Sequence, residues 1–115
     1  MILGFIGTGK ISSSIIYGIF KSKLKVSKIY ISSRNKNIAK KLSAKFKSVR
    51  ILKDNQDIIN KSSTIILGIT PEVGSKILSK LNFSKNKKII SLISTINLDK
   101  LKKITKNKNI VRATP

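Results

Sequence analysis

Hydrophobic positions along this chain alternate between short continuous runs and longer stretches with helical spacing. Six runs have the β-branched and aromatic composition of strands that are buried on both faces. They cover residues 2–6, 28–32, 49–52, 64–69, 88–93 and 110–112. The sequence therefore predicts six strands.

The five segments between these runs repeat their apolar residues at the spacing of one helix face, which predicts five helices. Residues 12–14 are expected on a smaller, more polar side of the first helix. Asp54 or Asn55 can cap the short third helix, and Pro71 suits the first position of the fourth. The fifth covers residues 98–104. The apolar positions of the first helix are Ile11, Ile15, Ile16, Ile19 and Phe20, and those of the second are Ile38, Leu42 and Phe46. Those of the third helix are Ile58 and Ile59, and those of the fourth are Val73, Ile77, Leu78 and Leu81.

Strict alternation of strand and helix predicts an α/β fold, an open doubly wound parallel sheet of Rossmann type with helices on both faces. Such sheets bind ligands at the carboxyl ends of their strands. With 115 residues the chain suits one domain, residues 1–115, which buries roughly 65% of its unfolded surface. Because no helix follows the sixth strand, we expect a longer protein.

Composition excludes several classes of site. The chain has no His and no Cys, which rules out a Ser-His-Asp triad, a thiol nucleophile, a disulfide framework and the usual zinc sites. The four acidic residues are scattered along the sequence, so no metal site is expected. They are Asp54, Asp57, Glu72 and Asp99. No residue has the signature of a general acid at neutral pH, so the sequence identifies no catalytic residue.

The formal charge of +21, from 25 Lys and Arg against 4 Asp and Glu, would ordinarily indicate a nucleic acid or an anionic membrane as partner. The composition also suits a genome rich in AT codons, since Lys and Ile occur 22 times each and Arg and Ala only 3 times each. Lysines are spread along the whole chain without forming an arm, which favours solvated faces over nucleic-acid binding. No apolar run approaches the ~20 residues of a membrane span. We expect a cytoplasmic protein that binds neither nucleic acid nor membrane.

A glycine-rich turn follows the first strand and precedes the first helix. It fits the pattern G-x-G-x-x-small, in which the first glycine allows a tight turn and the second leaves room for a pyrophosphate. The small third position lets the helix approach the strand, and the helix amides then hold the phosphates. A bare turn without a ligand is the alternative. The residues are Gly7, Thr8, Gly9, Lys10, Ile11 and Ser12.

The end of the second strand bears on the choice of cofactor. NAD-binding domains usually place Asp or Glu there to hold the ribose hydroxyls, whereas this chain has Ser32, Ser33, Arg34 and Asn35. Hydroxyls with a guanidinium suit a 2′-phosphate, because Arg offers a planar fork of donors. We expect NADP(H), with NAD(H) as the alternative cofactor and a solvated turn arginine as the alternative for Arg34.

Taken together, the motifs resemble, in order and spacing, the N-terminal domain of the pyrroline-5-carboxylate reductase family. The resemblance spans the chain. It rests on residues 4–9 (GFIGTG), 32–34 (SSR), 54–55 (DN), 67–71 (LGITP) and 111–115 (VRATP).

The resemblance implies reduction of 1-pyrroline-5-carboxylate to proline with NAD(P)H, and a small-molecule substrate. It implies that residues 7–12 cradle the pyrophosphate and that Ser33, Arg34 and Asn55 surround the 2′-phosphate. Gly68, Ile69, Thr70 and Pro71 would line the path toward the nicotinamide. The family's helical domain, which binds substrate and forms the dimer, has no counterpart in these residues. We therefore expect a homo-oligomer only if that domain exists, and no turnover by these residues alone.

Some positions depart from the family pattern. Thr70 stands where the family has a lysine, and Ser94 and Thr95 stand where it has smaller residues. Two other interpretations stay open: a related NADP oxidoreductase domain of the β-hydroxyacid dehydrogenase type, and a nucleotide-binding module without turnover.

Overall fold

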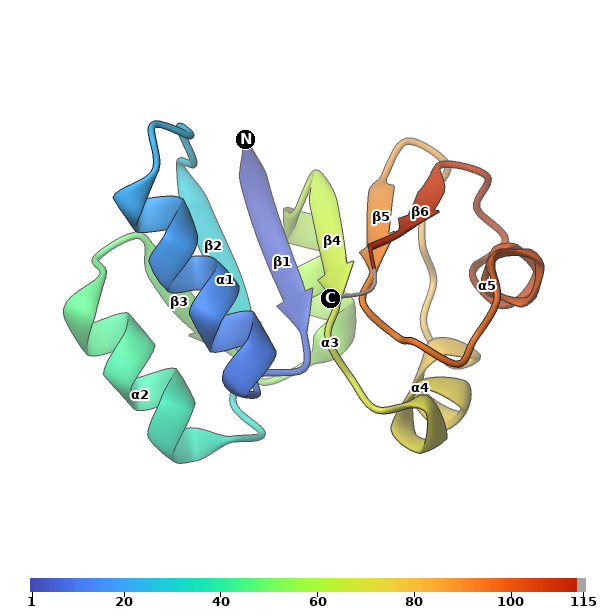
Figure 1. The fold of residues 1–115 in the computed structure, drawn as a ribbon, viewed down its shortest axis with the longest axis horizontal. Helices are drawn as coiled ribbons and strands as arrows, with labels where there is room; N and C mark the ends of the chain where they lie inside the picture. Colours follow the sequence, from blue (N-terminus) through green and yellow to red (C-terminus); the bar gives the residue numbers. More distant parts are fainter. Residues whose placement is uncertain (114–115) are drawn as a thin grey trace.

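A computed structural model describes residues 1–113 of the chain. Six parallel strands form one sheet in the order β3-β2-β1-β4-β5-β6. The strands are β1 (Ile2–Ile6), β2 (Lys28–Ser32), β3 (Val49–Leu52), β4 (Thr64–Leu67), β5 (Lys88–Ser91) and β6 (Ile110–Arg112). The helices are α1 (Lys10–Lys21), α2 (Lys36–Lys45), α3 (Asn55–Lys61), α4 (Pro71–Leu78) and α5 (Leu98–Thr105). The predicted doubly wound α/β fold is confirmed (Figure 1).

The order of the strands reverses next to β1. The chain runs from β1 outward to β2 and β3, then returns to pair β4 with the other side of β1. The loops that follow β1 and β4 therefore leave in opposite directions, and a crevice opens between them at the carboxyl edge of the sheet. In Figure 1 this edge is at the bottom, where the arrowheads of β1 and β4 end.

Side chains alternate between two cores, one on each face of the sheet. Leu3 and Phe5 of β1 pack in the core under α1 and α2, together with Ile16 and Leu42. Ile6 packs in the opposite core, which α3, α4 and α5 cover. Figure 1 shows α1 and α2 in front of the sheet and α3 behind it. The helices thus cover both faces, as predicted.

Strand β1 and helix α3 approach each other through two small residues. A Cβ atom on Gly4 would lie 2.2 Å from the Oγ of Ser62, the residue that ends α3. The Ser62 hydroxyl donates to the Ile58 carbonyl at 2.6 Å and so needs no partner in the sheet. Only glycine fits at position 4 with α3 in this place.

The predicted ends of two strands were wrong. β4 ends at Leu67 and β5 at Ser91, two residues earlier than the apolar runs 64–69 and 88–93 suggested. The strands end where their ladders end, since Leu67 is paired with both Ile6 and Ser91. Ile93 is nevertheless buried, so its hydrophobicity reflects packing and not pairing.

Three helical expectations also need correction. Ile11 is 52% exposed, because the first turn of α1 lies at the carboxyl edge, while Ser12 is 1% exposed and faces the sheet instead of a polar side. In α4 the buried positions are Gly74 and Leu78, and Leu81 comes after the end of the helix. Helix α5 extends one residue further than residues 98–104. Thr114 and Pro115, the end of the last family motif, lie outside the described residues.

Candidate functional site

The glycine turn after β1 has the geometry expected for a phosphate-binding turn. Gly7 has φ +96°, and a Cβ on it would lie 2.4 Å from the carbonyl oxygen of Gly68. Any other residue would be strained in conformation and would collide with the backbone after β4. Gly68 in turn leaves room for the Ser12 side chain, whose Oγ would lie 2.5 Å from a Cβ at position 68. The predictions of a tight turn at Gly7 and of close packing at Ser12 are confirmed.

Two buried hydroxyls hold this turn in place. Ser12 Oγ donates to the Gly7 carbonyl at 2.9 Å. Thr8 Oγ1 donates to the Ser32 carbonyl at 3.0 Å and lies 3.1 Å from Ser32 Oγ. The second contact joins the glycine turn to the end of β2. The two motifs that were predicted separately from the sequence, the glycine turn and the segment after the second strand, are therefore in direct contact.

Gly9 and the start of α1 face open space. No heavy atom lies within 4 Å of where a Cβ on Gly9 would be. Gly9 occupies the N-cap position without a side-chain hydrogen bond, and the first turn of α1 carries no acidic residue. The first backbone N–H groups of a helix lack partners within the helix, and they carry a partial positive charge. This end of α1 therefore fits a diphosphate, which would take both the space and the donors.

A cavity of about 730 Å³ opens beside the turn, within the range that holds small ligands. Its walls come from the glycine turn, the loop after β2 with the start of α2, and the loop after β4 with the start of α4. The lining residues are Thr8, Gly9, Arg34, Asn35, Lys36, Asn37, Gly68, Ile69, Thr70 and Val73.

A narrower cavity of about 280 Å³ shares Arg34 and Ile69 with the first. It extends toward the end of β3 and is lined by both apolar and polar residues. Its lining residues are Ile6, Gly7, Ser32, Ser33, Arg34, Lys53, Asn55, Ile69 and Ile77.

Most of the predicted binding residues meet around these two adjoining cavities. Lys10 and Ile11 do not line them; they border a separate groove of about 470 Å³ with Ile15 and Leu92. Ser12 is buried beneath the turn, so it acts through the Gly7 carbonyl. Pro71 is half-buried and begins α4, as predicted.

Several residues around the cavities were not among the predicted binding residues. Asn35 caps α2 by accepting from the Ile38 N–H at 3.4 Å, which places the first turn of α2 against the larger cavity. Lys53 borders the narrower one. The signal for Lys53 was available, because it directly follows the third predicted strand, just as the Ser33-Arg34 pair follows the second.

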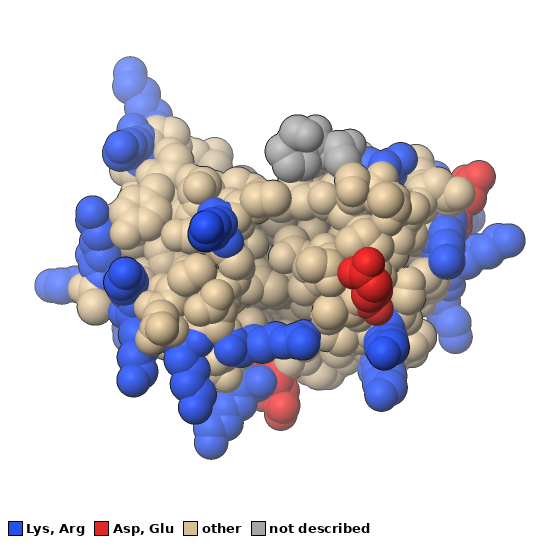
Figure 2. Space-filling model, turned by 60° about the horizontal axis from the view of Figure 1, so that its bottom comes forward, with Lys and Arg blue, Asp and Glu red and all other residues tan. Residues whose placement is uncertain are grey.

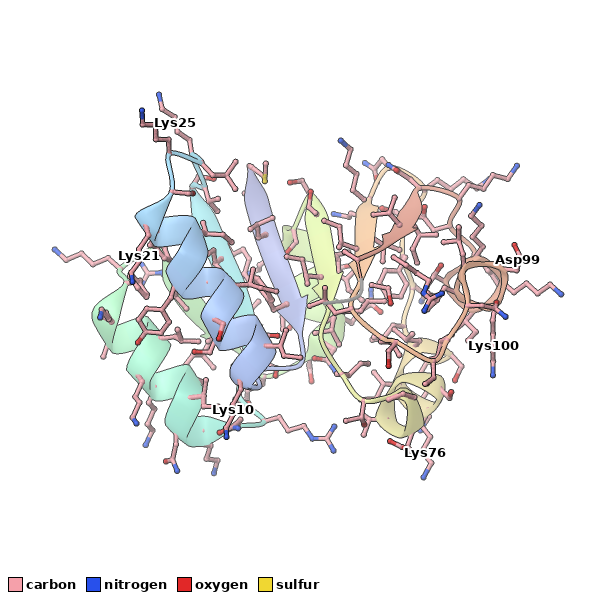
Figure 3. The ribbon with its side chains drawn as sticks, viewed as in Figure 1. Lys10, Lys21, Lys25, Lys76, Asp99 and Lys100 are labelled. Atoms are coloured by element: carbon pink, nitrogen blue, oxygen red, sulfur yellow. The ribbon has the colours of Figure 1, made fainter. Side chains whose placement is uncertain are left out.

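Basic side chains surround the site without filling it. Figure 2 shows the carboxyl edge with a hollow in its middle and Lys and Arg side chains around its rim. Figure 3 shows that lysines also lie far from this edge: Lys10 is at the start of α1, whereas Lys25 lies at the opposite end of the molecule and Lys76 and Lys100 point outward from α4 and α5. The charge is thus a property of the whole surface, with the site as one part of it.

The described residues contain neither a cluster of common metal ligands nor a membrane-spanning helix. Among residues 1–113, no three His, Cys, Asp or Glu side chains gather closely enough to hold a metal ion. In the same part of the chain, no helix has the length and apolar character needed to cross a membrane.

Known proteins share the sequence pattern and the fold of this chain. A family model described as NADP oxidoreductase coenzyme F420-dependent matches residues 2–97. Pyrroline-5-carboxylate reductase of Glycine max is 27% identical over 115 residues, covering 98% of this chain and 42% of that protein. The structure of 1-pyrroline-5-carboxylate reductase from Streptococcus pyogenes has a TM-score of 0.81 at 30% identity, over 100% of this chain and 42% of that one.

A Plasmodium falciparum pyrroline carboxylate reductase, solved with NADP bound, also has a TM-score of 0.81 and covers 100% of this chain. At 21% identity that likeness shows the fold alone. This chain spans about 42% of the length of each of these three relatives.

Proposed function

Because this chain belongs to the family described as NADP oxidoreductase coenzyme F420-dependent, we propose that it is the NADP(H)-binding domain of a pyrroline-5-carboxylate reductase. The reaction would be reduction of 1-pyrroline-5-carboxylate to L-proline. One observation carries the cofactor part of the proposal: Gly9 and Arg34 line the same cavity, which puts an open helix N-terminus and a guanidinium within reach of one ligand. The curated relatives named above support the substrate.

Each wall of the cavities has a role in this proposal. The amides at the start of α1 bind the pyrophosphate, in the space that Gly9 leaves open. The loop after β2 binds the adenosine 2′-phosphate through Ser33 and Arg34, with Asn55 across the narrower cavity. Ile69 lies between the two cavities and supplies apolar surface to the nucleoside.

The residues from Gly68 to Pro71 line the path along which the cofactor extends toward its nicotinamide ring. Thr70 presents a neutral hydroxyl at the larger cavity. When bound, the nicotinamide supplies the hydride, and the protein supplies position and electrostatics.

Titration calorimetry with NADPH and NADH tests the cofactor part of the proposal. We expect one NADPH per chain, bound more tightly than NADH. If NADPH does not bind, or binds without needing the glycine turn, the proposed site is wrong.

Genetic complementation tests the substrate. The natural gene that encodes this chain is expressed in a bacterium that requires proline because it lacks pyrroline-5-carboxylate reductase. Growth without proline is the expected result. Failure to grow despite expression of an NADPH-binding protein would instead favour an oxidoreductase of the β-hydroxyacid dehydrogenase type or a module without turnover.

A further inference from the structure

Lys53 lies beside the predicted 2′-phosphate site, although nothing in the family motifs singles it out. In the register of the two strands, Ser32 is paired with Leu52. The next residue of each strand, Ser33 and Lys53, therefore leaves the sheet at the same edge. Parallel strands bring their carboxyl ends together in this way.

The narrower cavity brings Lys53 to the same ligand space as Arg34. Ser32, Ser33, Asn55 and both cations line it, together with the apolar side chains of Ile69 and Ile77. A nucleoside in this cavity would therefore meet apolar and polar groups. The polar groups are two hydroxyls, one amide and two cationic groups, all lining one space.

We propose that Lys53 and Arg34 together bind the 2′-phosphate of NADP(H), and that Lys53 is a specificity-determining residue of this protein. A phosphate monoester carries nearly two negative charges at neutral pH. The Arg34 guanidinium presents a rigid planar fork of donors, whereas the Lys53 ammonium is a point charge on a flexible stem. The two groups are complementary, because one fixes the orientation of the phosphate and the other follows it.

The overall charge of the chain is compatible with this role. Its 4 acidic residues are outnumbered by 25 basic ones, and one of the four, Asp54, directly follows Lys53. Lys53 is exposed in this structure and would exchange water for phosphate oxygens on binding. Charge-assisted contacts of this kind are among the stronger hydrogen bonds in proteins.

This inference depends on the proposed function, and the experiment separates the two. Dissociation constants for NADPH and NADH are measured by calorimetry for the unmodified protein, Lys53→Gln, Lys53→Arg and Lys47→Gln. Lys47 is an exposed lysine that precedes β3, so its variant removes the same charge from the other end of the same strand. Circular dichroism checks that every variant is folded.

We expect Lys53→Gln to weaken NADPH binding about tenfold and to leave NADH within about twofold. Lys53→Arg should retain most of the affinity, and Lys47→Gln should change neither cofactor. In the double variant with Arg34→Gln, the two losses should not add, because both residues contact one phosphate.

Three results would overturn the inference. The first is an unchanged dissociation constant for NADPH in Lys53→Gln. The second is an equal loss of NADH affinity in that variant, and the third is an equal loss of NADPH affinity in Lys47→Gln. Each result would mean that Lys53 contributes no more than general surface charge. If the unmodified protein binds neither cofactor, the proposed function fails, and this inference fails with it. If it binds NADPH and Lys53→Gln does too with unchanged affinity, only the role of Lys53 is lost.

Discussion

The hydroxyl of Thr8 donates to the main-chain carbonyl of Ser32 across 24 positions of sequence, at 3.0 Å. Thr8 is only 4% exposed, and its Oγ1 also lies 3.1 Å from the Ser32 hydroxyl. This contact links the glycine turn to the loop that carries Arg34. A single side chain therefore connects the turn proposed for the pyrophosphate with the loop proposed for the 2′-phosphate.

Replacing Thr8 by Val should lower the free energy of unfolding by about 1–3 kcal/mol, because the Ser32 carbonyl would lose its buried donor. Urea unfolding measures the change. NADPH affinity should fall as well, since the loop after β2 is no longer tied to the turn. Thr8→Ser keeps the donor and serves as the control. A loss in Thr8→Ser as large as that in Thr8→Val would contradict this reason, because Ser keeps the hydroxyl donor.

The two glycines of the turn should respond differently to alanine. Gly7→Ala should destabilise the fold by more than about 2 kcal/mol, because φ is +96° and the new Cβ meets the Gly68 carbonyl. Gly9→Ala should cost less than about 1 kcal/mol, because its Cβ points into open space. The same Cβ should nevertheless weaken NADPH binding by at least tenfold, since it occupies the phosphate space. Thermal unfolding and calorimetry on both variants separate the two effects.

Gly18→Ala is the matched control for these variants. Gly18 lies within α1, and a Cβ there would meet nothing within 4 Å. Alanine should raise the stability by about 0.5–1 kcal/mol, through helix propensity, and leave NADPH binding unchanged. If Gly9→Ala behaves like Gly18→Ala in both assays, no ligand approaches Gly9.

Arg34 should set the preference between the two cofactors. We expect NADPH to bind more tightly than NADH by about 1.5–3 kcal/mol, and Arg34→Glu to shrink or reverse this difference. Arg50→Glu makes the same change of charge at an exposed position on β3 and should preserve the preference. Equal affinity of the unmodified protein for both cofactors would contradict the assignment of Arg34 to a 2′-phosphate site.

The surface charge should not make this protein a nucleic-acid binder. Lysines on every side of the molecule give weak, non-specific attraction, which counterion release makes strongly dependent on salt. We expect binding to random duplex DNA to vanish near physiological salt in a fluorescence anisotropy titration. A tight complex that persists at about 200 mM salt would contradict this expectation.

The 115 residues alone should bind NADPH without oxidising it in the presence of 1-pyrroline-5-carboxylate. Hydride transfer needs the reacting atoms held about 3–3.5 Å apart, and small displacements cost orders of magnitude in rate. Ser94 and Thr95, which follow β5, are exposed and line neither cavity of the site. The assay follows NADPH absorbance against a blank without protein. Turnover above the blank would show that these residues contain the whole active site.

The order and type of all eleven elements could be predicted from hydrophobic spacing, because a parallel sheet buries its strands on both faces. The ends of β4 and β5 could not, since pairing with neighbours decides them. Ile93 shows the difference: it lies beyond β5, yet a Cβ on Gly74 of α4 would come within 3.2 Å of its Cδ1. Ile93 is hydrophobic because it packs against α4, which precedes it in the sequence and does not belong to the sheet.

The glycine turn and Arg34 could be predicted because their chemistry is local: a positive φ, an open backbone, and a cation after a strand. The contact between Thr8 and Ser32 depends on how β1 and β2 lie side by side, and spacing along the chain does not report it. Ile11 was expected in the core for a related reason. Its position in the helical repeat is apolar, but in the first turn of α1 Ser12 faces the sheet and Ile11 is exposed.

The close approach of Gly4 to Ser62 bears on the proposed 2′-phosphate site from a distance. Helix α3 is about 10 Å long; its last turn lies against β1 at Gly4, and its first residue, Asn55, borders the narrower cavity two positions after Lys53. A larger residue at position 4 would push α3 away from the sheet and shift Asn55 and Lys53 relative to Arg34. A substitution at Gly4, which lines neither cavity, would therefore change the shape of the narrower cavity through the whole length of a helix.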